Sequence, residues 1–245
     1  MSLTILHGAA RPLPVPGKTQ SATLSLHEAD DAGKGRIRLD DDAGKGRIRL
    51  DNETTILLAA EQTFARHGFK GATMAMIADQ AQLPKPNLHY YFGNKQTLYM
   101  TVLSGILRDW LVPLDYFHPQ ACAREAIERY VRQKMRFTFS RPEASRLFAS
   151  EILHGAPLAL PLLQTTLREL VDDKAAVIDS WIAQGQLTPL DSRHLLFSIW
   201  AMTQTYADFA VQIGAILGDA AQGPQAQQRA VDHVLSSVMR ICGLA

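Results

Sequence analysis

Residues 54–99 read TTILLAAEQTFARHGFKGATMAMIADQAQLPKPNLHYYFGNKQTLY, and this stretch determines the fold that we expect. Its apolar spacing indicates three short helices and the start of a fourth. The first helix is expected to open at Asn52, whose side chain can cap a free backbone N–H. Apolar residues then recur at helical spacing from Ile56 to Phe64. Gly68 follows the last of them, as is typical of a left-handed helix end.

The second and third helices of this stretch are joined by a very short turn. Thr73 can cap the second helix, and Gln82 lies in the turn that follows it. The apolar face of the second helix comprises Met74, Ile77, Ala78 and Ala81. The third helix is expected to start at Pro84, where a missing N–H costs little. Gly93 ends it, and Asn94 can cap the next helix.

The outward side of the third helix has the chemistry of a DNA-reading surface. Leu88 and Phe92 are four residues apart and face inward. An Asn side chain can pair with adenine, a Lys can reach guanine acceptors, and a Pro ring can touch a thymine methyl. Hydroxyl and ring N–H groups suit phosphate oxygens. We therefore expect contacts with double-stranded DNA from Thr73, Lys85, Pro86, Asn87, His89, Tyr90, Tyr91 and Lys95.

The segment resembles the DNA-binding domain of the TetR family of bacterial repressors. The residues that carry the resemblance are Ala60, Phe64, Gly68, Phe69, Thr73, Ile77, Ala78, the aromatic run 88–92 and Lys95. Three positions depart from the family pattern: Gln82 replaces the usual turn Gly, Pro84 the usual Ser or Thr cap, and His89 the first Tyr. The resemblance implies operator binding by a helix-turn-helix in a homodimer. These departures leave the operator sequence and the individual phosphate contacts open.

Length and charge set the domain organisation and exclude some classes of protein. The 245 residues suit an N-terminal arm (1–51), a small DNA-binding domain (52–97) and a larger body (98–245). The net charge of +1 is not that of a non-specific nucleic-acid binder, so binding requires a dimer with local phosphate contacts. No apolar run reaches the ~18 residues that span a bilayer.

Cysteine and histidine usage points away from metal sites and catalysis. Cys122 and Cys242 are the two cysteines, and they build neither a metal site nor a disulfide framework, so a cytoplasmic setting is expected. None of the eight histidines has a Ser, Cys or carboxylate at catalytic or metal-binding spacing. We expect no catalytic residue, no metal and no cofactor.

The N-terminal arm contains an exact duplication. The segment DDAGKGRIRLD occurs at 30–40 and again at 41–51. The arm shows no sustained periodicity, so we expect it to be disordered. An alternative is that its arginines enter a minor groove beside the operator. Those arginines are Arg36, Arg38, Arg47 and Arg49.

The chain beyond the DNA-binding segment is expected to be entirely helical, giving an all-α protein of about nine helices. The predicted helices cover 95–111, 123–140, 142–155, 157–185, 191–218 and 225–241. The first of these is apolar on more than one side, so it should be buried. It could link the DNA-binding domain (52–97), which we call the reader, to the larger body (98–245). The last two are rich in Ala, Ile, Leu and Val, and we expect them to form the homodimer interface as a four-helix arrangement.

One of these helices places polar groups in an apolar field. Trp200, Gln204 and Asp208 are four residues apart and share a face. A buried Gln requires partners for its carbonyl and amide, and a planar ligand between Trp rings could supply them. The alternative is that Gln204 bonds to a threonine or to backbone and that the Trp residues are core.

The body also resembles a particular branch of the TetR family, the regulators of pyrimidine utilisation. The similar segments are 109–114, 141–158 and 180–212. This resemblance implies an effector such as uracil or thymine, whose imide edge is complementary to an amide side chain. The expected ligand contacts are Trp110, Phe148, Glu151, Trp200, Thr203 and Gln204.

The sequence thus predicts a homodimeric one-component transcriptional repressor that a small ligand releases from its operator. Three alternatives are open. The ligand could be another small planar or hydrophobic molecule, since pockets diverge faster than folds. The chain could be an all-helical enzyme, which turnover of a pyrimidine would reveal. It could also be an interaction module whose altered turn and cap have ended DNA binding.

Overall fold

The computed structural model describes the backbone of residues 36–244 and the side chains of residues 49–244, and all regular structure in it is helical, as predicted. The helices are α1 (Arg36–Gly71), α2 (Met74–Ala81), α3 (Lys85–Phe92), α4 (Lys95–Leu111), α5 (Ala123–Ser140), α6 (Pro142–Leu153), α7 (Leu160–Leu162), α8 (Arg168–Ala183), α9 (Ser192–Asp208), α10 (Ala210–Leu217) and α11 (Gly223–Ile241). From Lys45 onward the chain forms one compact unit. Within residues 36–244, no helix combines the length and the apolar character needed to cross a membrane.

The start of α1 differs from the prediction. α1 begins at Arg36, so the N-cap predicted at Asn52 is wrong and Asn52 lies inside the helix. A capping residue acts only where the preceding backbone leaves helical geometry, and here the backbone upstream is helical. The sequence analysis expected a disordered arm over 1–51; the structure describes 36–51 as part of α1, and 1–35 lie outside the described residues. The predicted stop at Gly68 is confirmed by its φ of 65°.

Local capping defines α2 and the start of α4 as predicted, whereas α3 starts one residue later than predicted. The Thr73 hydroxyl oxygen accepts from Met76 N at 3.2 Å, and Asn94 Oδ1 accepts from Thr97 N at 2.9 Å. Gln82 ends α2 in the left-handed conformation, with φ 55°. Pro84 is the N-cap of α3 and not its first residue. Its fixed φ still suits this position, so the predicted helix is shifted by one residue.

Two of the predicted body helices are divided, which gives more helices in residues 36–244 than the nine expected. α4 and α5 have the predicted bounds. The predicted helix 157–185 has a π turn at Leu163–Leu167 between α7 and α8. The predicted helix 191–218 starts at its Asp191 cap, which accepts from His194 N at 2.9 Å. It is interrupted at Phe209, where φ is −112° and ψ is 27°, so that α9 and α10 are separate helices.

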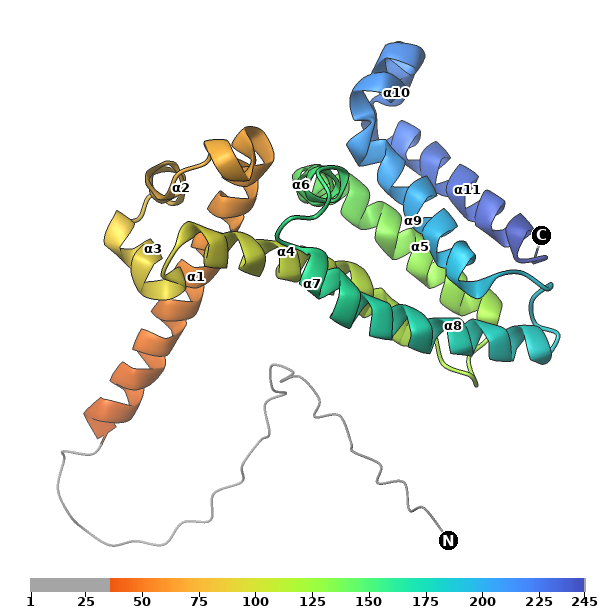
Figure 1. Cartoon of the computed structure of the whole chain (residues 1–245), viewed down its shortest axis with the longest axis horizontal. Coiled ribbons are helices and arrows are strands. Elements are labelled where there is room, and N and C mark those ends of the chain that lie inside the picture. The colour runs from red at the N-terminus through yellow and green to blue at the C-terminus, as the bar shows by residue number, and fades with distance from the viewer. Residues whose placement is uncertain (1–35, 245) are drawn as a thin grey trace, which may run out of the picture. The chain divides into compact units, whose positions relative to one another are not determined.

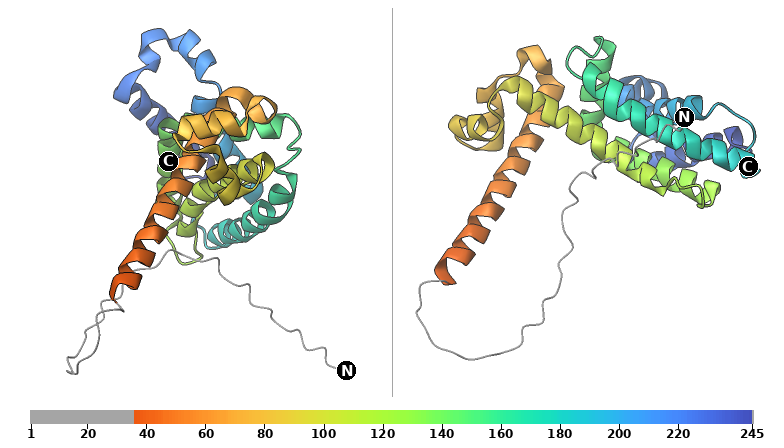
Figure 2. Two further views of the ribbon diagram at one scale, coloured as in Figure 1. Left: turned by 90° about the vertical axis from the view of Figure 1, so that its left-hand side faces the viewer. Right: turned by 60° about the horizontal axis from the view of Figure 1, so that its bottom comes forward.

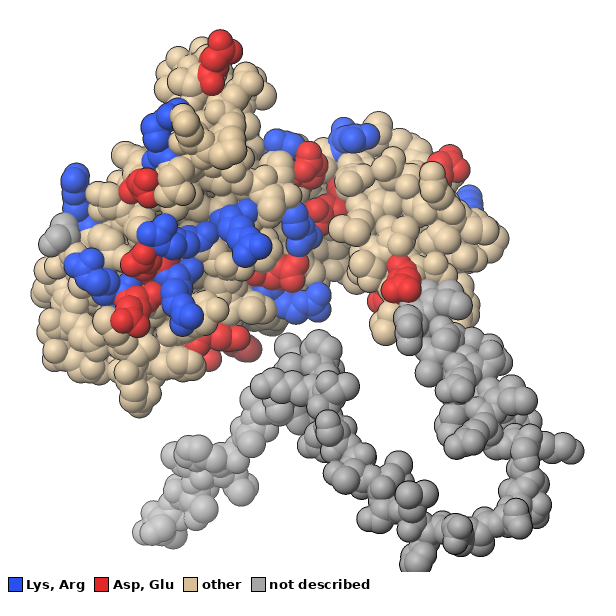
Figure 3. Space-filling model, turned by 180° about the vertical axis from the view of Figure 1, so that it is seen from behind, with Lys and Arg blue, Asp and Glu red and all other residues tan. Residues whose placement is uncertain are grey.

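The helix α4 connects the reader to the body (Figure 1). It continues from the α2–α3 pair, contacts α6 and leads into the body, as the views from other sides also show (Figure 2). Its predicted buried residues are all buried: Leu98, Val102, Leu103, Ile106 and Trp110. α5, α9 and α11 pack together in the body. On the face shown in Figure 3, basic and acidic side chains are interspersed over the body, and neither sign forms a continuous patch.

Candidate nucleic-acid interface and ligand pocket

The exposed face of α3 carries most of the residues predicted to read DNA. Leu88 and Phe92 are buried, and α3 contacts α2 and α4, which turns the other side of the helix outward. The predicted contacts that the structure leaves exposed on it are Lys85, Pro86, His89 and Tyr90. Asn87 and Tyr91 are half-buried, and Tyr91 packs against the core. The ring Nδ1 of His89 lies 2.8 Å from Gly93 O, which leaves the other ring nitrogen for a ligand.

Lys95 has a different environment from the other predicted DNA contacts. Its ammonium donates to Phe69 O at 2.8 Å and to Ala72 O at 2.9 Å. The same nitrogen lies 4.6 Å from the centre of the Phe69 ring. These contacts tie the start of α4 to the end of α1. The Lys95 ammonium, which was predicted to contact a phosphate, is thus already hydrogen-bonded within the reader. Its contacts stabilise the reader itself.

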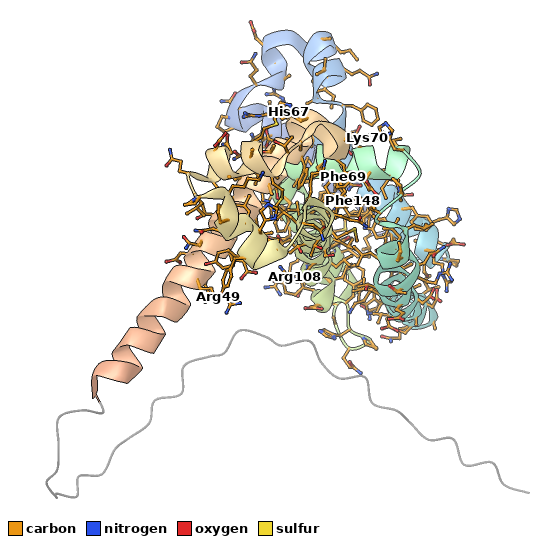
Figure 4. All side chains as sticks on the ribbon, turned by 60° about the vertical axis from the view of Figure 1, so that its left-hand side comes forward. Arg49, His67, Phe69, Lys70, Arg108 and Phe148 are labelled. Atoms are coloured by element: carbon orange, nitrogen blue, oxygen red, sulfur yellow. The ribbon has the colours of Figure 1, made fainter. Side chains whose placement is uncertain are left out.

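Arg49 is a further candidate for DNA contact beside the recognition helix. It lies on α1, where Figure 4 labels it, and its guanidinium carbon is 6.0 Å from the centre of the exposed Tyr90 ring. The sequence placed Arg49 in an arm that could enter a minor groove, and the structure places it on a helix instead. The side chains of Arg36, Arg38 and Arg47 lie outside the described residues.

The body contains a cavity of about 670 Å³. Its walls come from α4, α5, α6, α9 and the segment around Leu163. Four of the six predicted ligand contacts line it: Trp110, Phe148, Trp200 and Gln204. The Trp110 and Phe148 rings meet edge to face, with centres 5.1 Å apart. The exposed side chain of Leu153 lies at the rim of the cavity.

The two other predicted ligand contacts lie outside the lining of this cavity. Glu151 is buried, and its carboxylate accepts from Tyr99 OH at 2.9 Å, from Leu158 N at 2.8 Å and from Ala159 N at 3.0 Å. It therefore joins α6 to α4 and fixes the following loop. Thr203 is fully buried, and its hydroxyl donates to Ile199 O at 2.7 Å within α9. Both side chains have their hydrogen bonds satisfied within the protein.

Sequence reasoning missed the charged residue of the cavity, Lys134. It lies on α5, is 2% exposed and lines the cavity. Its ammonium is 4.2 Å from the centre of the Trp110 ring. Burial lowers the pKa of Lys134 to about 7, against a smaller opposing effect of Asp208. The signal was present in the sequence, because Lys134 follows Tyr130 by four residues on the apolar stripe of α5.

A second polar cluster joins the reader to the body. Arg141, between α5 and α6, places Nη2 2.5 Å from Glu61 Oε2 on α1 and Nη1 2.7 Å from Asp109 Oδ2 on α4. The Glu61 side chain is only 10% exposed. Arg141 therefore connects α1, α4 and the junction between α5 and α6 at one point that is partly shielded from water. Sequence analysis gave no indication of this contact, since the three residues are far apart along the chain.

Comparison with known proteins agrees with both parts of this architecture. Residues 56–101 match the family described as "Bacterial regulatory proteins, tetR family", and residues 103–245 match the family described as "YcdC-like protein, C-terminal region". The chain is 46% identical over 163 residues to the HTH-type transcriptional regulator RutR of Escherichia coli (strain K12), covering 66% of this chain and 77% of that protein. It is 29% identical over 140 residues to the HTH-type transcriptional repressor NicS of Pseudomonas putida, covering 54% of this chain and 61% of that protein.

Solved structures share the fold at low sequence identity. A bacterial regulatory protein in the tetR family from Rhodococcus RHA1 superimposes with a TM-score of 0.60 at 15% identity, covering 79% of this chain and 98% of that chain. AibR, solved in complex with isovaleryl coenzyme A and operator DNA, gives a TM-score of 0.59 at 16% identity, covering 78% and 98%. At these identities the likeness concerns the fold alone.

Proposed function

Because this chain belongs to the TetR family of bacterial transcriptional regulators, we propose that it is a homodimeric cytoplasmic repressor that a pyrimidine such as uracil or thymine releases from operator DNA. The helix-turn-helix α2–α3 binds the operator, and the cavity of the body binds the effector. The DNA contacts proposed are those of the exposed face of α3 and its half-buried Asn87, with the Thr73 hydroxyl and Arg49 beside them.

The observation that carries the proposal is that one helix serves both sites. α4 starts at Lys95, three residues after the end of α3, and Trp110 in its last turn lines the cavity. A ligand that displaces the Trp110 ring acts directly on the helix that supports the reader. Two recognition helices in a dimer must lie about 34 Å apart to meet successive major grooves. A shift of α4 changes that spacing.

A pyrimidine fits the chemistry of the lining. Gln204 offers one carbonyl and one amide group, which complement the imide edge of uracil or thymine. The Trp110 and Trp200 rings both line the cavity and can stack on a planar ligand. The indole N–H of Trp200 is occupied by a 2.7 Å hydrogen bond to Tyr130 OH, so its ring is held in place. The resemblance of the body to regulators of pyrimidine utilisation supports the same effector.

Release of DNA requires the ligand to bind one conformation better than the other. A difference of about 1.4 kcal/mol between the two conformations changes operator affinity tenfold. The cavity residues need therefore supply only a modest difference in binding free energy.

The dimer face proposed comprises α9, α10 and α11. α10 carries several large apolar side chains that are exposed in the single chain: Val211 (89%), Ile216 (73%) and Leu217 (51%). Such a patch is unusual on a protein that acts as a monomer. A second copy packed on it would bury these side chains, and it would supply the second recognition helix that operator binding requires.

A mobility-shift assay on the promoter of the protein's own gene tests the proposal. The wild-type protein is expected to shift this DNA at moderate salt and to release it when uracil is added. Asn87→Ala should abolish the specific shift, whereas the matched variant Gln164→Ala, exposed on the body, should behave as wild type. Circular dichroism checks that Asn87→Ala is folded. Absence of a specific shift would contradict the repressor, and a shift insensitive to pyrimidines would contradict the effector.

One observation favours a second candidate, a TetR-family regulator of a different, more apolar ligand. Much of the cavity wall is aliphatic, including Leu107, Leu111, Leu163 and Leu167. Thermal melting across a metabolite panel separates the two candidates. A pyrimidine effector raises the melting temperature with uracil or thymine, and the second candidate requires that only apolar compounds do so.

A further inference from the structure

The cavity contains a buried lysine whose side chain has no hydrogen-bonding partner within residues 49–244. Lys134 is 2% exposed, and its ammonium faces the Trp110 ring at 4.2 Å. Among the hydrogen bonds and ion pairs of residues 49–244, none is donated by this nitrogen; Lys134 takes part only through its backbone carbonyl, which accepts from Thr138 Oγ1. Burying an ammonium without a hydrogen-bonded anion is costly. A group on a bound molecule can offset that cost, and Lys134 lines the cavity where such a molecule would lie.

The position of Lys134 opposite Gln204 is set by two hydrogen bonds between α5 and α9. Tyr130 OH accepts from Trp200 Nε1 at 2.7 Å, and Thr138 Oγ1 donates to Thr203 O at 3.0 Å. Tyr130 and Thr138 lie one turn before and one turn after Lys134 on the same face of α5. The segment of α9 that carries Gln204 is therefore held against the part of α5 that carries Lys134.

The other charged groups at this end of the cavity, Asp208 and Arg146, have partners of their own. Asp208 lies one turn beyond Gln204 on the same face of α9. Its carboxylate Oδ1 accepts from Ser145 Oγ at 2.6 Å. Arg146 also lines the cavity, and its guanidinium pairs with Glu143 Oε1 at 3.2 Å. Asp208 and Arg146 thus have partners within residues 49–244, whereas the Lys134 side chain has no hydrogen-bonding partner there. This arrangement favours a ligand that brings an electron-rich oxygen to Lys134.

We propose that Lys134 determines the chemical class of the effector: a planar ring with an exocyclic oxygen that accepts a hydrogen bond from this ammonium, while Gln204 pairs with the adjacent N–H and C=O edge. The inference rests on the proposed function, because it places the effector in the same cavity. The assignment goes further than the proposed function because it excludes rings that carry amino groups in place of the exocyclic oxygens. It also excludes hydrocarbons as effectors. It also assigns a binding role to Lys134, in addition to Trp110, Trp200 and Gln204.

Isothermal titration calorimetry on the full-length protein tests this assignment. The probes are uracil and 2,4-diaminopyrimidine, in which amino groups replace both oxygens. Wild type is expected to bind uracil and not 2,4-diaminopyrimidine. Lys134→Met should weaken uracil binding by about 10–100-fold, the effect of losing a hydrogen bond to a charged group. The matched variant Lys174→Met, on α8 outside the cavity lining, should leave it unchanged. Uracil binding by Lys134→Met equal to that of wild type would overturn the assignment.

Folding and effector identity are controlled separately. Lys134→Met replaces the lysine by an apolar side chain of similar length. Lys134→Gln is a second variant, which keeps a hydrogen-bond donor. The Lys134→Gln protein should bind uracil more tightly than the Lys134→Met protein. If wild type shifts its operator but binds no uracil or thymine, these two bases are excluded as the effector. The same titrations with orotate and nicotinate then decide the role of Lys134. Binding that depends on Lys134 supports the role, and binding only of rings without an acceptor oxygen, or of none of these probes, refutes it.

Discussion

Arg141 and Glu61 are 80 residues apart in sequence, and their side chains meet at 2.5 Å between Nη2 and Oε2. The contact joins the helix that begins the reader to the joint between α5 and α6. Because Arg141 also binds Asp109 on α4, one guanidinium holds three helices that must keep a fixed arrangement for the reader to fit DNA. The pair is partly shielded from water, so it contributes more than an exposed ion pair does.

Replacing Arg141 by Met should therefore lower stability and weaken the coupling between the two sites. We expect a loss of about 1–3 kcal/mol in the free energy of unfolding, the cost of leaving a partly buried carboxylate without its partner. Urea denaturation measures this loss. The operator shift of Arg141→Met should also respond less to uracil than that of wild type. Arg193→Met, which removes the exposed pair with Asp172, is the matched control and should change neither quantity. An unchanged response to uracil would show that coupling does not pass through Arg141.

Gln82→Gly should stabilise the protein. Gln82 has a φ of 55°, a conformation that a residue with a Cβ adopts at a cost and that Gly adopts freely. Part of the gain is cancelled because Gly makes the unfolded chain more flexible. The net expectation is about 0.5–1 kcal/mol, measured by thermal or urea unfolding. Gln80→Gly, inside α2, has helical geometry and should destabilise by about 1 kcal/mol. A loss of stability in both variants would indicate that the Gln82 side chain has a stabilising contact.

Lys85 and Lys95 should respond differently to substitution, although both were predicted to contact DNA. Lys85 is exposed on α3, so Lys85→Ala should reduce the salt dependence of operator binding by about one phosphate contact. The Lys95 ammonium is bound to Phe69 O and Ala72 O, so Lys95→Met should lower the free energy of unfolding by about 1–3 kcal/mol. Fluorescence anisotropy at several salt concentrations measures the first effect, and urea denaturation the second. If Lys95→Met changes the salt dependence and leaves stability unaltered, its predicted phosphate contact is correct.

Lys134 should make stability depend on pH in a predictable direction. Its pKa falls from the ordinary value of 10.5 to about 7 on folding. Between these values the unfolded chain binds more protons than the native protein, so stability rises with pH. Below about pH 7 the lysine is charged in both states and the effect is constant. The Asp208 and Arg146 side chains and the hydroxyl and ring groups of Tyr130 and His154 also face this cavity.

These other groups are common to wild type and Lys134→Met, so the comparison of the two proteins isolates the lysine. The stability of wild type relative to Lys134→Met should increase by about 1–2 kcal/mol between pH 7 and pH 8.5. Urea denaturation at both pH values measures it. A constant difference across this range would mean that the pKa of Lys134 is not lowered by burial.

Features set by neighbouring residues could be predicted from the sequence. α4 has its predicted bounds because the cap at Asn94 and the break at Pro113 are local signals. The faces of α2 and α3 follow from the spacing of a few apolar residues. Asn52 was misassigned because a good capping residue does not show whether the chain before it is already helical. The break at Phe209 has neither Gly nor Pro to mark it, so periodicity alone could not reveal it.

The candidate sites could be predicted only where a side chain's partner lies on the same helix face. Trp200 and Gln204 were identified from spacing, and they line the cavity. Glu151 was expected to contact the ligand because of the resemblance, and the sequence does not show that its partners are Tyr99 and the loop at 158–159. Arg141 and Glu61 are brought together by the fold, and no local pattern indicates such a pair.

The arrangement of α6 has a consequence for the design of biosensors. Ser150 and Ile152 line the cavity, whereas Glu151 between them points away from it and binds Tyr99 of α4. Recognition of the ligand and attachment to the reader therefore depend on different faces of one helix. Libraries that vary the lining at 150, 152 and 153 can explore new inducers while Glu151 and Arg141 are kept. Under the proposed mechanism, such variants keep the contacts that join α6 to α4 and Arg141 to α1, so screening for a new response starts from an intact connection.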